Sequence, residues 1–281
     1  MSDDDLRPAE ARDRATLEAW FRAAPVEHCF LLTQLENHGL VGFHVLGDPP
    51  VAGAYVRTGR LLVPFGPRTG GRELARSLAG ADIELRYVVG PLELVDEFWA
   101  GIRDQVPEPT WLRRNRLYAM ESKDLLPATP PAQGRLRASE LGDLPWLARA
   151  SSSMDREDRG VDPLEEDPVG LERYIMWLVH EGLVFVWEEG GRLLFKAQAA
   201  CLNRRAALVE GVYTVPEARG RGVGTHAMRA LCRGLLGRAP LLTLYVNEAN
   251  TPAVRLYETV GFRHVGHYRS VLFSRQVAVK G

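Results

Sequence analysis

A glycine-rich turn between a strand-like and a helix-like segment places the strongest constraint on this chain. Residues 209–214 are mainly apolar and predict a strand, and a helix is predicted to begin near Gly224 or Thr225. The turn between them, residues 219–224, reads Arg-Gly-Arg-Gly-Val-Gly. Glycine has no Cβ atom, so backbone amides in such a turn can approach a ligand closely.

The turn is therefore predicted to hold an anion, most naturally phosphate. The start of the following helix adds unpaired N–H groups and the positive end of the helix dipole. Arg219 and Arg221 can supply charge-assisted hydrogen bonds to the same oxygens. The alternative is a plain strand-to-helix connection. The spacing matches neither a P-loop nor the dinucleotide-binding glycine motif.

A second segment follows at residues 241–262. Residues 241–246 predict a buried strand, Thr251 suits a helix N-cap, and Pro252 suits the first helical position. Gly261 is predicted to end this helix. Asn250 and Tyr257 are seven residues apart and are expected to share a face.

The two segments together resemble the GNAT (Gcn5-related N-acetyltransferase) superfamily. Arg219, Gly222 and Gly224 match its Arg/Gln-x-x-Gly-x-Gly/Ala loop, which binds the pyrophosphate of acetyl-CoA. The family's next motif, Asn-x-x-Ala-x-x-Leu-Tyr-x-x-x-Gly-Phe, is matched by Asn250, Ala253, Leu256, Tyr257, Gly261 and Phe262. Within the superfamily the match is similar to the branch of glycine N-acyltransferase-like proteins and two-domain bacterial acetyltransferases.

The resemblance implies a set of site residues. Tyr257 stands where the family places its general acid, although it also completes an apolar helix stripe and could be a core tyrosine. Glu210 is the candidate base because it is a carboxylate among the apolar residues of 208–212, although it could equally be a solvated strand residue or a partner of Arg219. Tyr245 stands where other members carry a glutamate base, so that base is not carried over, and a water chain could replace it. The expected cofactor-binding residues are Val212, Tyr213, Thr214, Arg219, Gly220, Arg221, Gly222, Val223, Gly224, Thr225 and Asn250.

The resemblance further implies an acetyl-CoA-dependent N-acyltransferase in which a primary amine of a small molecule or peptide attacks the thioester directly. The alternative is a non-catalytic acyl-CoA-binding or regulatory protein. An acid-rich stretch, residues 151–168, could select a cationic acceptor or could be a solvated loop. The histidines and cysteines show no metal-ligand spacing, so no metal is expected. Cys232 is predicted to be a core residue rather than an acyl carrier.

Composition restricts the remaining possibilities. A net charge of −1 gives no support for a nucleic-acid or membrane partner, and a homodimer remains possible. Three cysteines without a CxxC pair fit a reducing cytoplasm. The first residues are acidic and no long apolar run follows them, which argues against a signal peptide or a membrane span.

The length of 281 residues favours two domains. We predict an α/β (α+β) chain with an N-terminal α/β domain at 1–126, a Pro-rich linker at 127–134 and a GNAT domain at 135–281 with a mixed, mostly antiparallel sheet flanked by helices. In the first part, helices are expected at 12–24, 27–38, 72–79 and 91–102, and strands at 41–46, 51–57, 60–65, 83–89 and 111–121. In the second part, strands are expected at 135–138, 183–189, 192–202 and 205–214, and helices at 140–152 and 169–181.

The order of elements in 60–121 repeats that in 205–272. The first half could therefore be a degenerate GNAT-like repeat without the cofactor motif, or the order could be that of any α/β domain.

Overall fold

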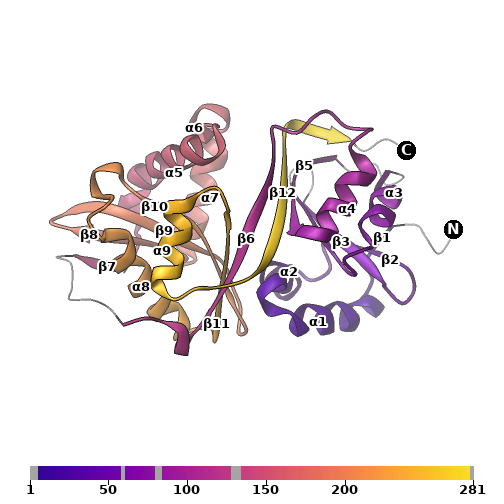
Figure 1. Ribbon diagram of the computed structural model, residues 1–281, viewed down its shortest axis with the longest axis horizontal. Coiled ribbons are helices and arrows are strands. Elements are labelled where there is room, and N and C mark those ends of the chain that lie inside the picture. Colours follow the sequence, from indigo (N-terminus) through magenta and orange to yellow (C-terminus); the bar gives the residue numbers. More distant parts are fainter. Residues whose placement is uncertain (1–5, 58–60, 80–83, 128–133, 279–281) are drawn as a thin grey trace. The chain divides into compact units, whose positions relative to one another are not determined.

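The computed structural model describes residues 6–57, 61–79, 84–127 and 134–278 (Figure 1). The chain divides into two compact units, each built from separate segments. Unit 1 contains Met1–Tyr118, Tyr245–Asn250 and His264–Gly281, and unit 2 contains Ala119–Leu244 and Thr251–Arg263. The predicted domain boundaries stay a prediction, and residues 128–133 of the predicted linker lie outside the described residues.

Unit 1 is built on strands in the order β1-β2-β3-β4-β5-β12-β6. The pair β4–β5 is parallel, whereas β1–β2, β2–β3, β3–β4 and β5–β12 are antiparallel. The strands are β1 (Arg7–Pro8), β2 (Phe43–Leu46), β3 (Ala52–Arg57), β4 (Leu61–Phe65), β5 (Glu84–Pro91), β6 (Trp111–Glu121) and β12 (Arg263–Ala278).

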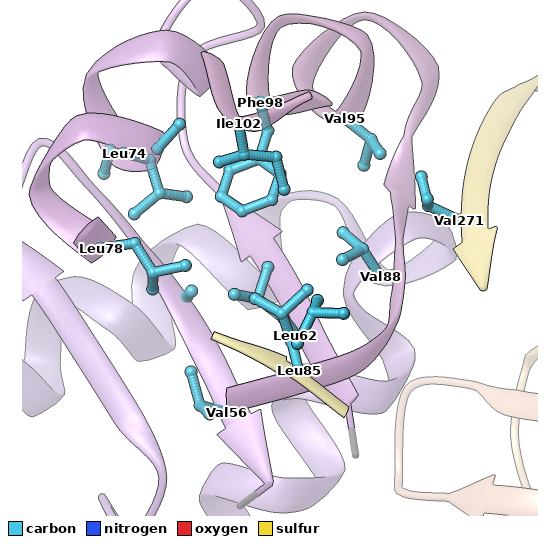
Figure 2. Close-up of a cluster of buried hydrophobic side chains, with 14 of the residues drawn as sticks. Val56, Leu62, Leu74, Leu78, Leu85, Val88, Val95, Phe98, Ile102 and Val271 are labelled. Carbon is cyan, nitrogen blue, oxygen red and sulfur yellow. The ribbon is translucent and has the colours of Figure 1, made fainter. Parts of the chain in front are cut away.

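Two pairs of helices cover the two faces of this sheet. Neighbouring residues of a strand point to opposite faces, so apolar residues in sequence pack with different helices. Leu62 and Val88 pack with the helices α3 (Gly71–Ala79) and α4 (Leu92–Ile102), as Figure 2 shows. Val63 and Val89 pack in a second cluster with α1 (Arg14–Ala23) and α2 (Pro25–His38). Unit 1 is thus a three-layer α/β structure, with the helices close to their predicted positions.

Unit 2 carries its strands in the order β11-β10-β9-β8-β7, with only β10–β11 parallel among its paired strands. These strands are β7 (Arg135–Ala138), β8 (Val184–Glu189), β9 (Arg192–Leu202), β10 (Ala207–Thr214) and β11 (Leu241–Asn247). Its helices are α5 (Leu144–Arg159), α6 (Pro163–Glu166), α7 (Pro168–His180), α8 (Val223–Leu236) and α9 (Thr251–Val260). Side chains of α5 and α7 pack on Val184 and Val186 of β8. The prediction of a mixed, mostly antiparallel sheet flanked by helices is confirmed.

The predicted helix end at residue 152 is wrong, because most of the stretch 151–168 is helical. Helix α5 continues to Arg159 and ends at Gly160 in a left-handed conformation, and the short helix α6 follows. Ser151 and Ser152 are buried on the inner face of α5. Small polar residues in a core-facing position hide the apolar periodicity from which a helix is predicted.

The same order of elements occurs in both units and begins with the same local motif. Each first strand leads through a 3-10 turn into a helix, at Ala11–Asp13 in unit 1 and at Leu141–Asp143 in unit 2. Arg7 binds both carboxylate oxygens of Asp13, with distances of 2.7 and 2.9 Å. Arg137 binds Asp143 in the same way, at 2.7 and 3.0 Å. A capping box accompanies each pair.

Candidate functional site

Strand β10 is distorted in the middle. Its antiparallel register with β9 shifts between Glu210 and Tyr213, and Gly211 adopts a positive φ of 60°. Among the described residues, the parallel register with β11 joins only Ala207 and Leu208 to that strand. A bulge of this kind frees backbone groups from the ladder, so the later part of β10 can offer its amides and carbonyls to another chain or ligand.

The turn after β10 has a conformation that requires glycine. Gly220 and Gly222 have φ values of 72° and 79°, in the left-handed region that L side chains rarely adopt. Gly224 is needed for a different reason, because a Cβ atom there would lie 3.0 Å from Thr214 Oγ1 and 3.8 Å from the Leu256 side chain. These glycines hold the turn close to both β10 and α9.

Helix α8 begins at Val223, one to two residues earlier than predicted, with Gly222 at the N-cap. The first hydrogen bond of the helix runs from the His226 N–H to the Gly222 carbonyl at 3.1 Å. The amides of Val223, Gly224 and Thr225 therefore precede the intrahelical ladder. A run of such amides at the N-terminus of a 14-residue helix is suited to an anion.

Both arginines of the turn are paired with carboxylates. Arg219 contacts both Glu157 oxygens at 3.0 and 2.8 Å, and its Nε donates to the Thr214 carbonyl at 2.9 Å. Arg221 binds Glu189 at 2.9 Å. Exposed ion pairs contribute about 0–1 kcal/mol, so a phosphate can compete with these carboxylates for the guanidinium groups.

Tyr213 belongs to this network as well as to the core. The side chain is buried, its hydroxyl donates to Glu157 at 3.2 Å, and the Arg219 guanidinium lies 5.3 Å from its ring centre. Burial, followed by the nearby Glu157 carboxylate, raises the pKa of the phenol. Glu157 is thus a carboxylate that binds Arg219. The sequence interpretation did not single it out from the other acids of its stretch.

Tyr257 is buried on α9, with only 7 % of its surface exposed. Its ring lies edge-on to Phe262, with 5.9 Å between the ring centres. Burial raises the pKa of the phenol strongly, and negative charge on Cys232 or Asp158 would raise it further. The hydroxyl therefore stays protonated at neutral pH, which is the state that a proton donor needs.

Asn250 immediately precedes α9, because that helix begins at Thr251 rather than at the predicted Pro252. Its N–H donates to the Asn247 carbonyl at 2.9 Å. Asn250 belongs to unit 1 and Tyr257 to unit 2. Their shared face stays a prediction.

Glu210 lies opposite Gln198 of β9, so the two side chains point to the same face of the sheet. The Gln198 carboxamide covers the bulge, since a Cβ atom on Gly211 would be 3.0 Å from it. Gln198 Nε2 also donates to the hydroxyl of Tyr174 on α7 at 3.1 Å. Neither Gln198 nor Tyr174 belongs to a motif, so sequence analysis did not select them.

A buried lysine on β9 was also missed. Lys196 has 3 % of its surface exposed and is the strand neighbour of Tyr213 and Val186. Burial lowers its pKa to about 8, against the attraction of the Asp155 carboxylate. Burial also raises the pKa of Asp155, which lies 3.4 Å from Arg159. A lone charged residue in the apolar segment 193–202 was the signal that could have revealed it.

Cys232 is fully buried, and burial raises the pKa of its thiol to about 12. The preference for core packing over a covalent acyl-cysteine is consistent with this burial. Among the described residues, no group of three or more His, Cys, Asp or Glu side chains is arranged to hold a metal ion. No helix in the described part of the chain is both long and apolar enough to cross a membrane.

Comparison with known proteins places this arrangement in a family. Residues 147–262 match the family model described as Acetyltransferase (GNAT) family. Mycothiol acetyltransferase from Thermobispora bispora is 32 % identical over 277 residues, which cover 92 % of this chain and 87 % of that protein. This chain belongs to the GNAT acetyltransferase family.

Solved structures agree on the fold over almost the whole length. A Drosophila protein matches with a TM-score of 0.70 at 14 % identity, covering 95 % of this chain and 98 % of its own. A GCN5-related N-acetyltransferase from Sphaerobacter thermophilus matches with a TM-score of 0.61 at 17 % identity, covering 98 % and 96 %. The predicted GNAT fold is confirmed.

Family membership also decides the class of activity. The protein is an acetyl-CoA-dependent N-acetyltransferase that transfers the acetyl group to an amine acceptor. The alternative of a non-catalytic acyl-CoA-binding protein is therefore wrong. The roles of individual residues and the identity of the acceptor are separate questions.

Proposed function

We propose that a primary amine attacks the acetyl thioester directly in unit 2, with Tyr257 as general acid and Glu210 as general base. The amine nitrogen forms a bond to the thioester carbon, and the carbon–sulfur bond breaks. The departing thiolate takes its proton from the Tyr257 hydroxyl, and the nitrogen loses a proton to Glu210 or to a water held by it. Exchange with solvent then returns a proton to Tyr257 and removes one from Glu210. The products are an amide and coenzyme A.

The observation that carries the proposal is the burial of the Tyr257 phenol on the helix that packs beside the glycine-rich turn. Leu256, the residue before it, lies 3.8 Å from the position of a Cβ atom on Gly224. A phosphate group held by the amides of 223–225 would therefore anchor the cofactor in the same unit as the proposed acid. An acid with a raised pKa donates its proton only when a strong base, such as a thiolate, is generated next to it.

The cofactor is proposed to lie along the distorted part of β10 and over the turn. The backbone of Val212, Tyr213 and Thr214 would pair with the amides of the pantetheine arm, and a neighbouring N–H would polarise the thioester carbonyl. The pyrophosphate would sit on the amides that follow Gly222, with Arg219 and Arg221 exchanging their carboxylate partners for phosphate oxygens.

Glu210 is the proposed base because it occupies the bulge, where the strand would present both the thioester and the incoming amine. An amine is protonated at neutral pH, so it must lose one proton to solvent before it can attack, and it loses a second proton as the amide forms. A carboxylate on the same face as Gln198 is placed to accept it. The acceptor is proposed to be a small molecule, which the similarity to a mycothiol acetyltransferase supports.

The test is Tyr257→Phe. We expect kcat to fall by about 10²–10⁴, the usual contribution of a general acid, while calorimetry shows an unchanged Kd for coenzyme A. Tyr268→Phe is the matched control, because it removes another buried tyrosine hydroxyl, one that donates to the Glu27 carbonyl at 2.6 Å. A Tyr257→Phe enzyme with an unchanged kcat would remove Tyr257 from the mechanism.

A further inference from the structure

Helix α7 exposes an aromatic pair that the core does not account for. Tyr174 and Trp177 are stacked, with 6.5 Å between ring centres and 26° between ring planes. They remain 43 % and 49 % exposed. Most large aromatic side chains of this protein are buried, so two adjacent exposed rings are candidates for contact with a ligand.

The pair is connected to the proposed reaction centre by two side-chain contacts. Tyr174 accepts a hydrogen bond from Gln198 Nε2 at 3.1 Å. The Gln198 carboxamide in turn lies over Gly211, within 3.0–3.2 Å of the position that its Cβ atom would occupy. Gly211 directly follows Glu210 in the bulge, and Gln198 is the strand neighbour of Glu210. The aromatic pair is thus held at the side of the bulge that carries the proposed base.

The chemistry of this surface suits one class of amine. Two stacked rings offer a rigid apolar face that loses little conformational entropy when a ligand packs on it. A protonated amine that approaches Glu210 is also attracted by the ring faces before it loses its proton. The remaining part of such an acceptor would then lie on the rings rather than in water.

We propose that Tyr174 and Trp177 select the acceptor, and that this acceptor is a primary amine carrying an apolar ring, which packs on the pair while its nitrogen lies at Glu210. This inference rests on the proposed function, since it places the acceptor at the side of β10 where Glu210 lies. It assigns to α7 a role in specificity, separate from binding of the cofactor.

The test compares two probe amines, 2-phenylethylamine and n-propylamine, with acetyl-CoA as donor and thiol release as readout. The wild-type enzyme should prefer the ring-bearing amine by about tenfold or more in kcat/KM, the range that one well-packed apolar group provides. Trp177→Ala should bring the ratio close to one, through a higher KM for 2-phenylethylamine and an unchanged kcat. Met176→Ala is the control, because Met176 lies on the same helix, is equally exposed at 43 %, and is not part of the stacked pair.

Tyr174→Phe separates the contribution of the Tyr174 ring from that of its hydroxyl. It keeps the ring but removes the hydroxyl that accepts from Gln198. We expect an intermediate ratio, because the stack persists but is no longer fixed relative to the bulge. If the ratio for Trp177→Ala equals that of the wild type, the proposal is overturned. The same result together with a change from dimer to monomer in sedimentation would assign the pair to contact with a second copy of the chain.

Failure of the proposed function gives a different result. If neither amine is acetylated, calorimetry still tests the aromatic site. The binding of 2-phenylethylamine is measured for the wild type and for Trp177→Ala, both saturated with coenzyme A. Binding that is weakened about tenfold by the substitution supports the aromatic site even without turnover. Equal binding by both proteins, or no binding by either, refutes it. Loss of coenzyme A binding itself would contradict the proposed function instead.

Discussion

Replacement of Lys196 by methionine tests how the interior of unit 2 tolerates charge. Lys196 lies between Val186 and Tyr213 in the sheet and is almost fully buried. Asp155 attracts it, and Arg159 opposes its charge. Methionine has a similar length and no charge, so it can fill the same space without leaving a cavity.

The size of the effect follows from the pKa of the amine. Burial lowers it from 10.5 to about 8. Each pKa unit corresponds to about 1.4 kcal/mol, so the charged form destabilises the folded state by about 3 kcal/mol. Below pH 8 the amine is protonated in both states, and this penalty is fully present. Between pH 8 and pH 10.5 the folded protein has lost the proton while the unfolded chain still holds it, so the penalty disappears as the pH rises.

The assay is urea unfolding of the wild type and Lys196→Met at several pH values across this range, followed by tryptophan fluorescence. The stability of the wild type relative to the variant should increase by about 3 kcal/mol from pH 8 to pH 10.5. Lys123→Met is the control, because it makes the same substitution at an exposed lysine. Parallel curves for the wild type and Lys196→Met would refute the reasoning.

Three further substitutions or treatments test the site. Gly224→Ala should lower Tm and weaken coenzyme A binding, because the added Cβ atom would lie 3.0 Å from Thr214 Oγ1. A second substitution in the same chain, Thr214→Ala, should restore much of the lost Tm. If a thermal melt shows no recovery, the strain lies elsewhere. Glu157→Gln should tighten coenzyme A binding by up to about fivefold in calorimetry. The substitution releases Arg219 from an ion pair that competes with the phosphate and contributes about 1 kcal/mol at most. Weaker binding by the variant would contradict this competition. Cys232 should resist alkylation by iodoacetamide in the native protein at about pH 8, because its thiol is buried and burial raises the pKa of that thiol to about 12. Rapid alkylation, measured by mass spectrometry, would show that the thiol is accessible.

The parts of the fold that the sequence predicted are those governed by local chemistry. The glycines of 219–224 identified the turn because their conformations exclude other residues, as the positive φ values of Gly220 and Gly222 show. Helix α7 and the strands of unit 2 followed from apolar periodicity. The second half of α5 was missed because Ser151 and Ser152 occupy its inner face where apolar residues would mark a helix.

The site was less predictable where it depends on contacts between distant segments. The Arg219–Glu157 pair joins residues 62 positions apart, and neither residue indicates the other in the sequence. The link from Gln198 to Tyr174 depends on how α7 packs on β9, which periodicity does not specify. Lys196 was visible as a charge in an apolar strand, but its partner on α5 follows only from the fold.

The two units share an order of elements but differ, in their described residues, at the turn that leads into the helix after the third long strand. In unit 1 the strand before the turn contains Pro64, which has no amide to offer. The start of α3 is closed by α4, because a Cβ atom on Gly71 would lie 2.3 Å from the Leu94 carbonyl oxygen.

In unit 2 the turn before α8 is open at Gly220, since a Cβ atom there would meet nothing within 4 Å. Gly71 therefore allows α3 and α4 to pack closely. Gly220 instead allows a positive φ in the turn before α8. We infer that unit 1 keeps the architecture without the cofactor site. Binding of a single coenzyme A per chain in calorimetry is the expected result, and a second site of comparable affinity would show that packing at Gly71 does not exclude the ligand.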